Sequence, residues 1–265
     1  MMYKICNINI ICRKILRLTP SLLFKKFYAK KSCDIDLYVD IQESERERYH
    51  LESIPLSGQE TQCFRYNSEV MFTDKDWKHV WILPPIHQED ASTFLIQAFY
   101  THAVKRHMIQ VHSSLIDYQG RGIMFLGPSG IGKTTQAERW NEYRGAVIIN
   151  GDMVFVQETE DQFLGWGTPW HGSSPYCENA SVPLEALVIL KQSRENRIRR
   201  LEGFEMVAEV SNSVFYPTWL ENGMDLCLET LDHLLTHVPV YLLENRADEE
   251  AVTLLEQTLD QNKKE

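Results

Sequence analysis

The chain has few cysteines, and none of them falls in the spacings that zinc sites use. Its 265 residues include six, at Cys6, Cys12, Cys33, Cys63, Cys177 and Cys227, with no C-x-x-C pair. This pattern argues against a structural zinc site and favours reduced thiols in a cytoplasmic protein. Cys177 lies near the motifs described below, and we interpret it as a buried or half-buried thiol rather than a reactive one.

Long apolar runs and positive net charge are also missing. No stretch of 18 apolar residues exists, so the sequence predicts no membrane-spanning helix. The formal net charge is −10, which makes nucleic acid a poor candidate for the main partner. An apolar share of 43% is typical of a globular protein with a full core, and the length suits one to one and a half domains.

Acidic side chains are absent from the first 33 residues, which carry eight Lys or Arg. The rest of the chain has 19 basic and 37 acidic residues. Three interpretations stay open for the basic segment: a targeting peptide, a surface for an acidic partner, or a solvated strand and helix. The apolar run from Ile5 to Cys12 is broken by Asn7 and Asn9, which argues against a secretory signal.

What the sequence does contain is a complete phosphate-binding pattern, G-x-x-x-x-G-K-[ST]. It is formed by Gly127, Pro128, Ser129, Gly130, Ile131, Gly132, Lys133 and Thr134, and Thr135 follows. Glycines let successive backbone N–H groups turn toward phosphates. Lys133 supplies a positive charge to the β- and γ-phosphates, and the Thr134 hydroxyl can bind Mg²⁺. The pattern therefore predicts binding of ATP and Mg²⁺.

The residues around this pattern match what such a loop requires. Residues 123–126 form a short apolar run typical of a buried strand, and residues 134–143 contain helix formers without Gly or Pro. Gly145 stands where the C-terminus of a helix favours glycine. The alternative, a glycine-rich turn that binds nothing, fits this strand–loop–helix context poorly.

The periodicity divides the chain into a β-rich N-terminal region, residues 1–88, and an α/β domain, residues 89–265. Predicted strands are residues 36–41, 80–83, 109–118, 123–126, 146–149, 187–190 and 241–243. Predicted helices are residues 90–107, 134–143, 204–215, 224–236 and 248–259. The alternation of strands and helices favours a layered α/β core with helices on both faces of the sheet.

The predicted hairpin places His112 near the phosphate-binding loop. Its turn at residues 119–122 is centred near residue 121, which sets residue 112 opposite residues 129–130. His112 then lies at the end of the sheet where a γ-phosphate would bind. The alternative is an ordinary core or solvated histidine.

Asp152 follows the predicted strand 146–149, only 19 residues after Lys133. A strand–loop–helix–strand unit makes a right-handed crossover, so this strand should run parallel to residues 123–126 and end at the same edge. A carboxylate there can bind Mg²⁺ or accept a proton from an attacking hydroxyl. The alternative is an Asp in an ordinary strand-end turn. The short spacing favours a compact kinase.

The segment 165–174, Gly-Trp-Gly-Thr-Pro-Trp-His-Gly-Ser-Ser, combines glycines with two tryptophans. Close backbone approach would suit the lip of a substrate site, with Trp166 and Trp170 excluding water. A structural loop that caps the core fits equally well. We interpret His171 as a structural residue.

These motifs together resemble the HPr kinase/phosphorylase-like proteins, whose P-loop catalytic fold is similar to that of phosphoenolpyruvate carboxykinase. The likeness covers roughly residues 90–260 and rests chiefly on His112, the loop 127–134 and Asp152. Further matches are residues 165–169, 181–190 and 238–243. The resemblance implies ATP-dependent phosphorylation of a serine in a protein or peptide. It also implies that His112 assists the catalytic carboxylate, while Lys133, Thr134 and Asp152 handle phosphate and Mg²⁺.

Two departures shape this expectation. Bifunctional HPr kinases usually have two adjacent aspartates, where this chain has Gly151 and Asp152, and their C-terminal phosphorylase signature has no clear counterpart here. The resemblance leans instead toward kinases that modify ribosomally made peptides, including lasso peptides. Hexamers among the relatives make a homo-oligomer part of the expectation. The alternatives are a small-molecule kinase and a regulatory nucleotide-binding module without chemistry.

Overall fold

The computed structural model describes residues 1–13, 22–30, 34–41, 58, 61–66, 69–83 and 92–262. The chain divides into two compact units, Met1–Ala103 and Val104–Glu265. The division falls inside helix α1, Ser92–Val104, and the domain boundary expected between residues 88 and 89 stays a prediction. The start expected for this helix, at residue 90, lies outside the described residues.

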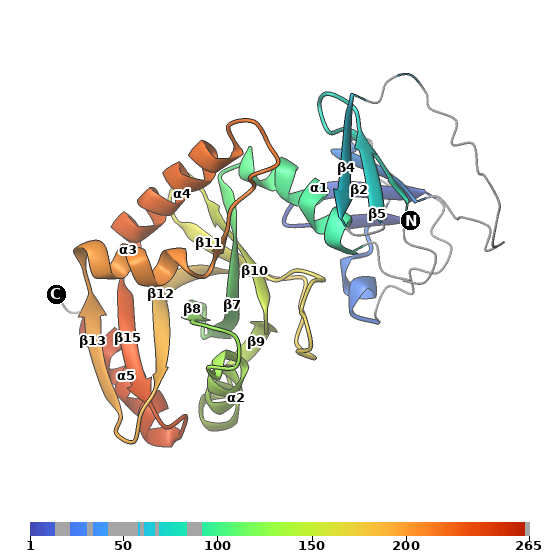
Figure 1. Cartoon of the computed structure of the whole chain (residues 1–265). Helices are drawn as coiled ribbons and strands as arrows, with labels where there is room; N and C mark the ends of the chain where they lie inside the picture. Colours follow the sequence, from blue (N-terminus) through green and yellow to red (C-terminus); the bar gives the residue numbers. More distant parts are fainter. Residues whose placement is uncertain are drawn as a thin grey trace. The chain divides into compact units, whose positions relative to one another are not determined.

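Among its described residues, the first unit is built on a six-stranded sheet (Figure 1). The strands are β1 Met2–Ile5, β2 Ile8–Arg13, β3 Leu37–Ile41, β4 Gln62–Tyr66, β5 Glu69–Thr73 and β6 His79–Leu83, with a short 3-10 helix, η1, at Leu22–Phe27. Their order in the sheet is β1-β2-β3-β6-β5-β4. Leu37, Val39 and Ile41 are buried, so β3 alternates as its sequence predicts.

The described part of the basic segment contributes two strands of this sheet and the helix η1, which carries Lys25 and Lys26. β1 and β2 form a hairpin whose turn holds Cys6 and Asn7 at positive φ. Lys4 and Arg13 are exposed, as expected for a solvated strand. Lys14, Arg17 and Lys31 lie outside the described residues.

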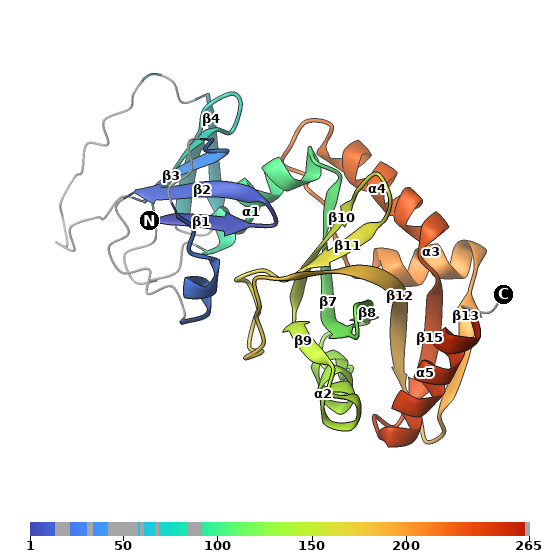
Figure 2. The ribbon, with the colours of Figure 1, turned by 180° about the vertical axis from the view of Figure 1, so that it is seen from behind.

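In the second unit, the described residues form a nine-stranded sheet of mixed direction (Figure 2). The strands are β7 Met108–Tyr118, β8 Arg121–Leu126, β9 Val147–Asn150, β10 Met153–Glu158, β11 Phe163–Trp166, β12 Ser181–Gln192, β13 Arg197–Leu201, β14 Val214–Phe215 and β15 Val240–Asn245. The main order is β11-β10-β7-β8-β12-β15-β13, and β9 and β14 each pair with β7. β8, β12 and β15 run parallel to one another.

The direction expected for the strand before Asp152 is found in β9. β9 and β8 both run antiparallel to β7, on its two sides, so they run in the same direction. They therefore end at the same edge of the sheet. β7 stands between them, which the sequence did not indicate.

Four helices follow in the second unit: α2 Lys133–Arg144, α3 Gly203–Ser211, α4 Gly223–His237 and α5 Glu249–Asn262. α2 and α5 share one buried cluster with the sheet, which includes Phe125, Trp140 and Leu255. Figures 1 and 2 show α3 on the opposite face of the sheet from α5. The expected mixed α/β class is thereby confirmed.

Several elements have limits that differ from those expected. The helix expected over residues 90–107 ends at Val104, and the strand expected over residues 241–243 extends over Val240–Asn245. The helix expected over residues 204–215 ends at Ser211, and Val214–Phe215 forms strand β14 against β7. The Ser213 carbonyl accepts the His112 N–H at 2.8 Å, so pairing with β7 holds this segment extended. The strand expected over residues 187–190 extends over Ser181–Gln192, because its first residues also pair with β11.

The hairpin between β7 and β8 is tighter than the sequence indicated. Its turn consists of Gln119 and Gly120, with φ of 57° and 80°, and Ser113 pairs with Leu126. Extending this register sets His112 opposite residue 127, so the expected partner at residues 129–130 was wrong. The error came from assigning four residues to a turn that needs only two. His112 still lies where β8 ends and the loop begins.

Candidate functional site

The loop that joins β8 to α2 has a backbone that glycine favours. Gly127, Gly130 and Gly132 have φ of 136°, 79° and 111°. Gly132 is the N-cap of α2, and it has no side chain to occupy the first N–H groups of the helix. Because these groups lack intrahelical partners, they form a ready site for an anion. Gly145 ends α2 at a φ of 67°, as expected.

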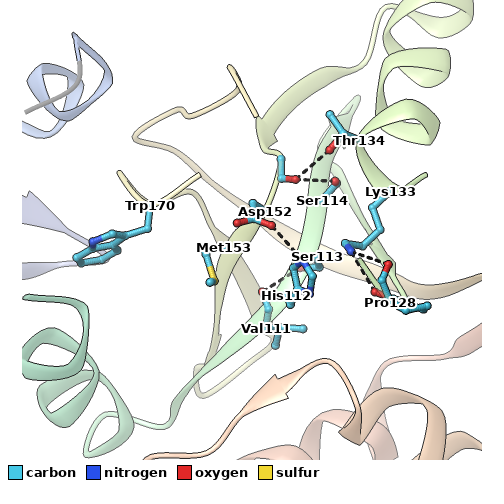
Figure 3. A network of polar contacts seen from close by, with 12 residues as sticks. Val111, His112, Ser113, Ser114, Pro128, Lys133, Thr134, Asp152, Met153 and Trp170 are labelled. Atoms are coloured by element: carbon cyan, nitrogen blue, oxygen red, sulfur yellow. Dashed lines mark hydrogen bonds and ion pairs between the residues drawn. The ribbon is translucent and has the colours of Figure 1, made fainter. Parts of the chain in front are cut away.

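Lys133 is a nearly buried cation that contacts carbonyl oxygens. Its Nζ donates to the carbonyls of Gly127 and Pro128 at 3.0 and 3.3 Å, and the residue is 6% exposed (Figure 3). Among the described residues it forms no ion pair. Burial lowers the pKa of Lys133, while the charge of Asp152 acts in the opposite direction. An anionic ligand would relieve this cost of burial.

His112 and Asp152 meet at the edge where β8 and β9 end. His112 Nε2 lies 3.0 Å from Asp152 Oδ1, and each side chain is 26% exposed (Figure 3). The pairing of β10 with β7 sets Met153 opposite His112, and the Ser113 N–H donates to the Asp152 carbonyl at 2.9 Å. Strand pairing therefore fixes the positions of both side chains. The sequence singled out these two residues separately, and the structure brings them into contact.

The turn that carries Asp152 is held by a buried asparagine. Asn150 Oδ1 accepts the backbone N–H groups of Asp152 and Met153 at 2.8 and 2.9 Å. Its Nδ2 donates to the carbonyls of Thr168 and Trp170 at 3.0 and 3.2 Å. One side chain thus holds both the turn that carries Asp152 and the segment that lies against it. Asn150 was not among the residues predicted from the sequence, and its place directly before Gly151 and Asp152 was the available signal.

Gly151 connects α2 to the same turn. Its carbonyl accepts the hydroxyls of Thr134 and Ser114, both at 3.1 Å (Figure 3). A Cβ at this position would lie 1.9 Å from Ser174 Oγ, so a side chain does not fit beside the present loop. A second carboxylate at position 151 would therefore require Ser174 to move.

The segment 165–174 lies against Asp152. A Cβ at Gly172 would fall 2.4 Å from Asp152 Oδ2, and Gly172 has a φ of 54°. His171 Nδ1 contacts the Ser174 carbonyl, which is the structural role expected for it. The first residues of the segment belong to β11. The segment therefore both closes the core and faces the carboxylate, and its two interpretations do not exclude each other.

A cavity of about 620 Å³ adjoins the loop. Residues 130–132 and Thr135 line one part of it, and the ends of β12 and β15 line the rest, including Arg194 and Arg246. Cavities of this size commonly hold small ligands. Local sequence patterns do not indicate this cavity, because its wall comes from segments at the ends of β8, β12 and β15 that only their parallel arrangement brings together.

The described residues show no other centre that could hold a metal. They contain no group of three or more His, Cys, Asp or Glu placed to bind an ion. The cysteines among them, Cys6, Cys12, Cys63, Cys177 and Cys227, are free thiols, and Cys33 lies outside the described residues. Cys177 is fully buried and its Sγ donates to the Thr168 carbonyl at 3.0 Å, which matches its interpretation as a buried thiol.

Among the described residues, no helix is long and apolar enough to span a membrane.

Comparison with known proteins shows the family. The model of the SynChlorMet cassette protein ScmC matches residues 91–248, more than half of the chain. The chain belongs to the ScmC family. An HPr kinase/phosphorylase of Mycoplasmopsis pulmonis (strain UAB CTIP) is 29% identical to it over 82 residues. The resemblance to HPr kinase/phosphorylase-like proteins is thereby confirmed.

The extent of these matches is limited. The match to the Mycoplasmopsis protein covers 31% of this chain and 24% of that protein, so the chain spans about a quarter of its curated relative. Among solved structures, the Hpr(Ser) kinase/phosphatase from Coxiella burnetii is similar over 58% of this chain and 95% of that chain. Its identity is 12% and its TM-score 0.33, which is too low to establish a common fold.

Proposed function

We propose that this ScmC family member is an ATP-dependent kinase with a P-loop core, and that it phosphorylates a serine hydroxyl of a protein or a ribosomally made peptide. The observation that carries the proposal is the 3.0 Å contact between His112 Nε2 and Asp152 Oδ1, beside the loop that holds Lys133. A phosphate-binding loop alone suits any nucleotide site. A carboxylate oriented by an imidazole at the edge of that loop can also take a proton from a hydroxyl.

The loop residues 127–134 and Thr135 would bind the triphosphate of ATP. Their glycines have the backbone geometry of such a cradle, and Lys133 is a buried cation that an anion would stabilise. The adjoining cavity, with Arg194 and Arg246 in its wall, has room for the base and ribose. These features support a nucleotide as the ligand.

Thr134 and Asp152 would hold Mg²⁺. Hydroxyl and carboxylate oxygens are the ligands that this ion prefers. The Thr134 hydroxyl lies at the Gly151 carbonyl, directly before Asp152 in the chain, so both side chains belong to one corner of the site. When bound, the ion neutralises charge on the β- and γ-phosphates.

Asp152 would accept the proton of the serine as its hydroxyl oxygen attacks the γ-phosphorus. His112 contacts Oδ1 and the turn at Gly172 lies beside Oδ2, so the incoming hydroxyl would approach Oδ2 alongside that turn. A bond forms between this oxygen and the γ-phosphorus, the bond to the β-phosphate oxygen breaks, and ADP leaves. Lys133 would stabilise charge on the phosphates. Most of the rate would come from positioning and charge compensation rather than covalent catalysis.

The acceptor class follows from the likeness to HPr kinase/phosphorylase and from the partial exposure of the His112–Asp152 pair, which leaves the carboxylate within reach of a peptide. The single carboxylate at residues 151–152 limits the proposal to the forward reaction. A cytoplasmic location and a homo-oligomer stay predictions.

Transfer of label from γ-labelled ATP to a cell extract tests the proposal. We expect the purified chain to produce phosphoserine in a protein or peptide, and we expect Asp152→Asn to abolish it while Asp161→Asn, at an exposed loop position, does not. Labelling of small metabolites alone would support a small-molecule kinase instead. Tight nucleotide binding without any transfer would support a regulatory module.

A further inference from the structure

The turn that touches Asp152 carries a serine at its tip. The Ser174 N–H donates to the His171 carbonyl at 3.0 Å, which closes a four-residue turn with Gly172 and Ser173 in its centre. Gly172 adopts the left-handed φ of 54° that such a turn uses. Ser173 is exposed.

The two serines of this turn differ in their availability. Ser174 is 8% exposed, its Oγ accepts the Tyr176 N–H at 3.3 Å, and it packs against Gly151. Within the part of the chain that the structure describes, the Ser173 hydroxyl has no hydrogen-bond partner. Ser173 is therefore the serine of this turn that is free to react.

Ser173 directly follows the glycine that lies beside the proposed base. A Cβ at Gly172 would fall 2.4 Å from Asp152 Oδ2, so the Gly172 Cα lies within about 4 Å of that oxygen. The Cα of Ser173 lies about 3.8 Å from the Cα of Gly172, across one peptide bond. Oδ2 is also the carboxylate oxygen that His112 does not contact.

The turn is anchored where its segment crosses the core. Thr168 Oγ1 donates to the Met153 carbonyl at 2.7 Å, and Asn150 Nδ2 donates to the Trp170 carbonyl at 3.2 Å. These bonds join the segment to the strands that carry Asp152. A hydroxyl in the same chain has a high effective concentration at the base once the turn brings it within reach.

We propose that Ser173 is a self-phosphorylation site of this chain, an inference that rests on the proposed kinase function. Ser173 Oγ forms a bond to the γ-phosphorus of ATP, and the bond between that phosphorus and the β-phosphate oxygen breaks. ADP leaves, and the hydroxyl proton passes to Asp152. The product is a phosphoserine whose charge is repelled by the carboxylate, which weakens the contact between the turn and Asp152.

The test uses the full chain, treated with phosphatase and then incubated with ATP and Mg²⁺. Tandem mass spectrometry of the peptide that contains residues 171–176 is expected to find phosphate on Ser173, approaching one per chain. Ser173→Ala should lose it, Ser173→Thr should carry it on the threonine, and Ser181→Ala, at another exposed serine, should keep it on Ser173. The rate per chain should not change with protein concentration.

The possible failures separate the two proposals. If the chain labels another protein or peptide while Ser173 stays bare, the self-phosphorylation site is refuted and the kinase stands. If no substrate and no residue of the chain is labelled, both fail. Equal phosphate in Asp152→Asn, or a rate per chain that rises with protein concentration, would also overturn the assignment of Ser173 to its own active site.

Discussion

A cation lies near each end of strand β8, and the two cations differ in the groups that they contact. At its start, Arg121 contacts Glu185 and pairs with Asp260 at 2.8 Å, and hydrogen bonding to Glu185 raises the pKa of Arg121. Just beyond its end, Lys133 meets only carbonyl oxygens at hydrogen-bonding distance, and burial lowers the pKa of Lys133. Arg121 has two carboxylate partners, whereas Lys133 forms no ion pair among the described residues and is only opposed at longer range by Asp152.

Arg144, at the other end of α2 from Lys133, follows the compensated pattern. Its Nε lies 2.7 Å from Glu256 Oε2, and Tyr118 donates to the same carboxylate at 2.7 Å. Hydrogen bonding to Glu256 raises the pKa of Arg144. The difference separates two kinds of charge in this molecule: the ion pair of Arg144 joins α2 to α5, whereas Lys133 forms no ion pair among the described residues and is the cation that we propose binds a ligand.

Asp152→Asn should have the largest effect on activity. Removal of the proposed base is expected to lower kcat by about 10³-fold or more, because asparagine cannot accept the proton and the charge that faces Lys133 is lost. Rates of phosphate transfer and thermal unfolding curves check this together. Asp161→Asn is the matched control, and an Asp152→Asn rate within tenfold of the wild type would remove Asp152 from the mechanism.

Lys133→Ala should weaken ATP binding by about 100-fold, or roughly 2.7 kcal/mol, without a matching loss of stability. The ammonium is costly to bury when no ligand is present, so its removal should leave the melting temperature unchanged or higher. Calorimetric titration with ATP and Mg²⁺, alongside unfolding curves, separates the two effects. A Lys133→Ala variant that unfolds readily but still binds ATP would show that Lys133, like the ion-paired arginines, acts in stability and not in ligand binding.

Arg144→Ala should show the opposite behaviour. We expect it to cost about 1–3 kcal/mol of unfolding free energy, because Glu256 loses its partner in a half-buried position. ATP affinity should stay within about twofold, since an ion pair of this kind acts through the fold and not through the ligand. Denaturant unfolding and the same titration provide both values. A large loss of ATP affinity in a folded variant would show that Arg144 belongs to the site.

Gly151→Ala should displace the segment 165–174 and cost about 1–3 kcal/mol, because the new Cβ would meet Ser174 Oγ at 1.9 Å. Ser174→Gly in the same chain should recover part of this loss. A double-mutant cycle measured by denaturant unfolding gives the coupling. Purely additive effects would mean that the two residues do not constrain each other.

His233→Gln should have the smallest effect, and one that depends on pH. The hydrogen bond to Glu158, at 2.9 Å, raises the pKa of His233 above its ordinary value of 6.5. His107 Nδ1 also lies 4.0 Å from this carboxylate. A raised folded-state pKa gives a stabilisation that is fully present below 6.5 and is lost as pH rises through the raised value. The variant should therefore differ from the wild type more at acidic than at alkaline pH, and a constant difference would contradict this.

Local sequence was sufficient for the strand–loop–helix unit, and it placed His112 and Asp152 near the loop, although the register of His112 was wrong. The glycines of the loop, the helix formers after Thr134 and the cap at Gly145 each act within a few residues. The direction of β9 followed from the handedness of the crossover, and this brought Asp152 to the edge where β8 ends. Whether His112, Asp152 and Lys133 perform the proposed roles stays a prediction.

The remaining features depend on contacts that local patterns do not encode. The register of His112 depended on a turn length, and the helix after residue 203 ended early because β14 pairs with β7. Ser174 lies so close to Gly151 that a side chain at position 151 would clash with it, and these two residues are far apart in the chain. The cavity with Arg194 needs three strands in parallel. Such features require the three-dimensional arrangement.

Recovery of phosphoserine after incubation of a cell extract with γ-labelled ATP tests the central claim most directly. Wild type, Arg144→Ala, Lys133→Ala and Asp152→Asn are compared at equal concentrations of folded protein. We predict that wild type and Arg144→Ala label a protein or peptide serine, and that Lys133→Ala and Asp152→Asn produce at most a trace. Equal labelling by Asp152→Asn, or no labelling by a wild type that binds ATP tightly, would contradict the account.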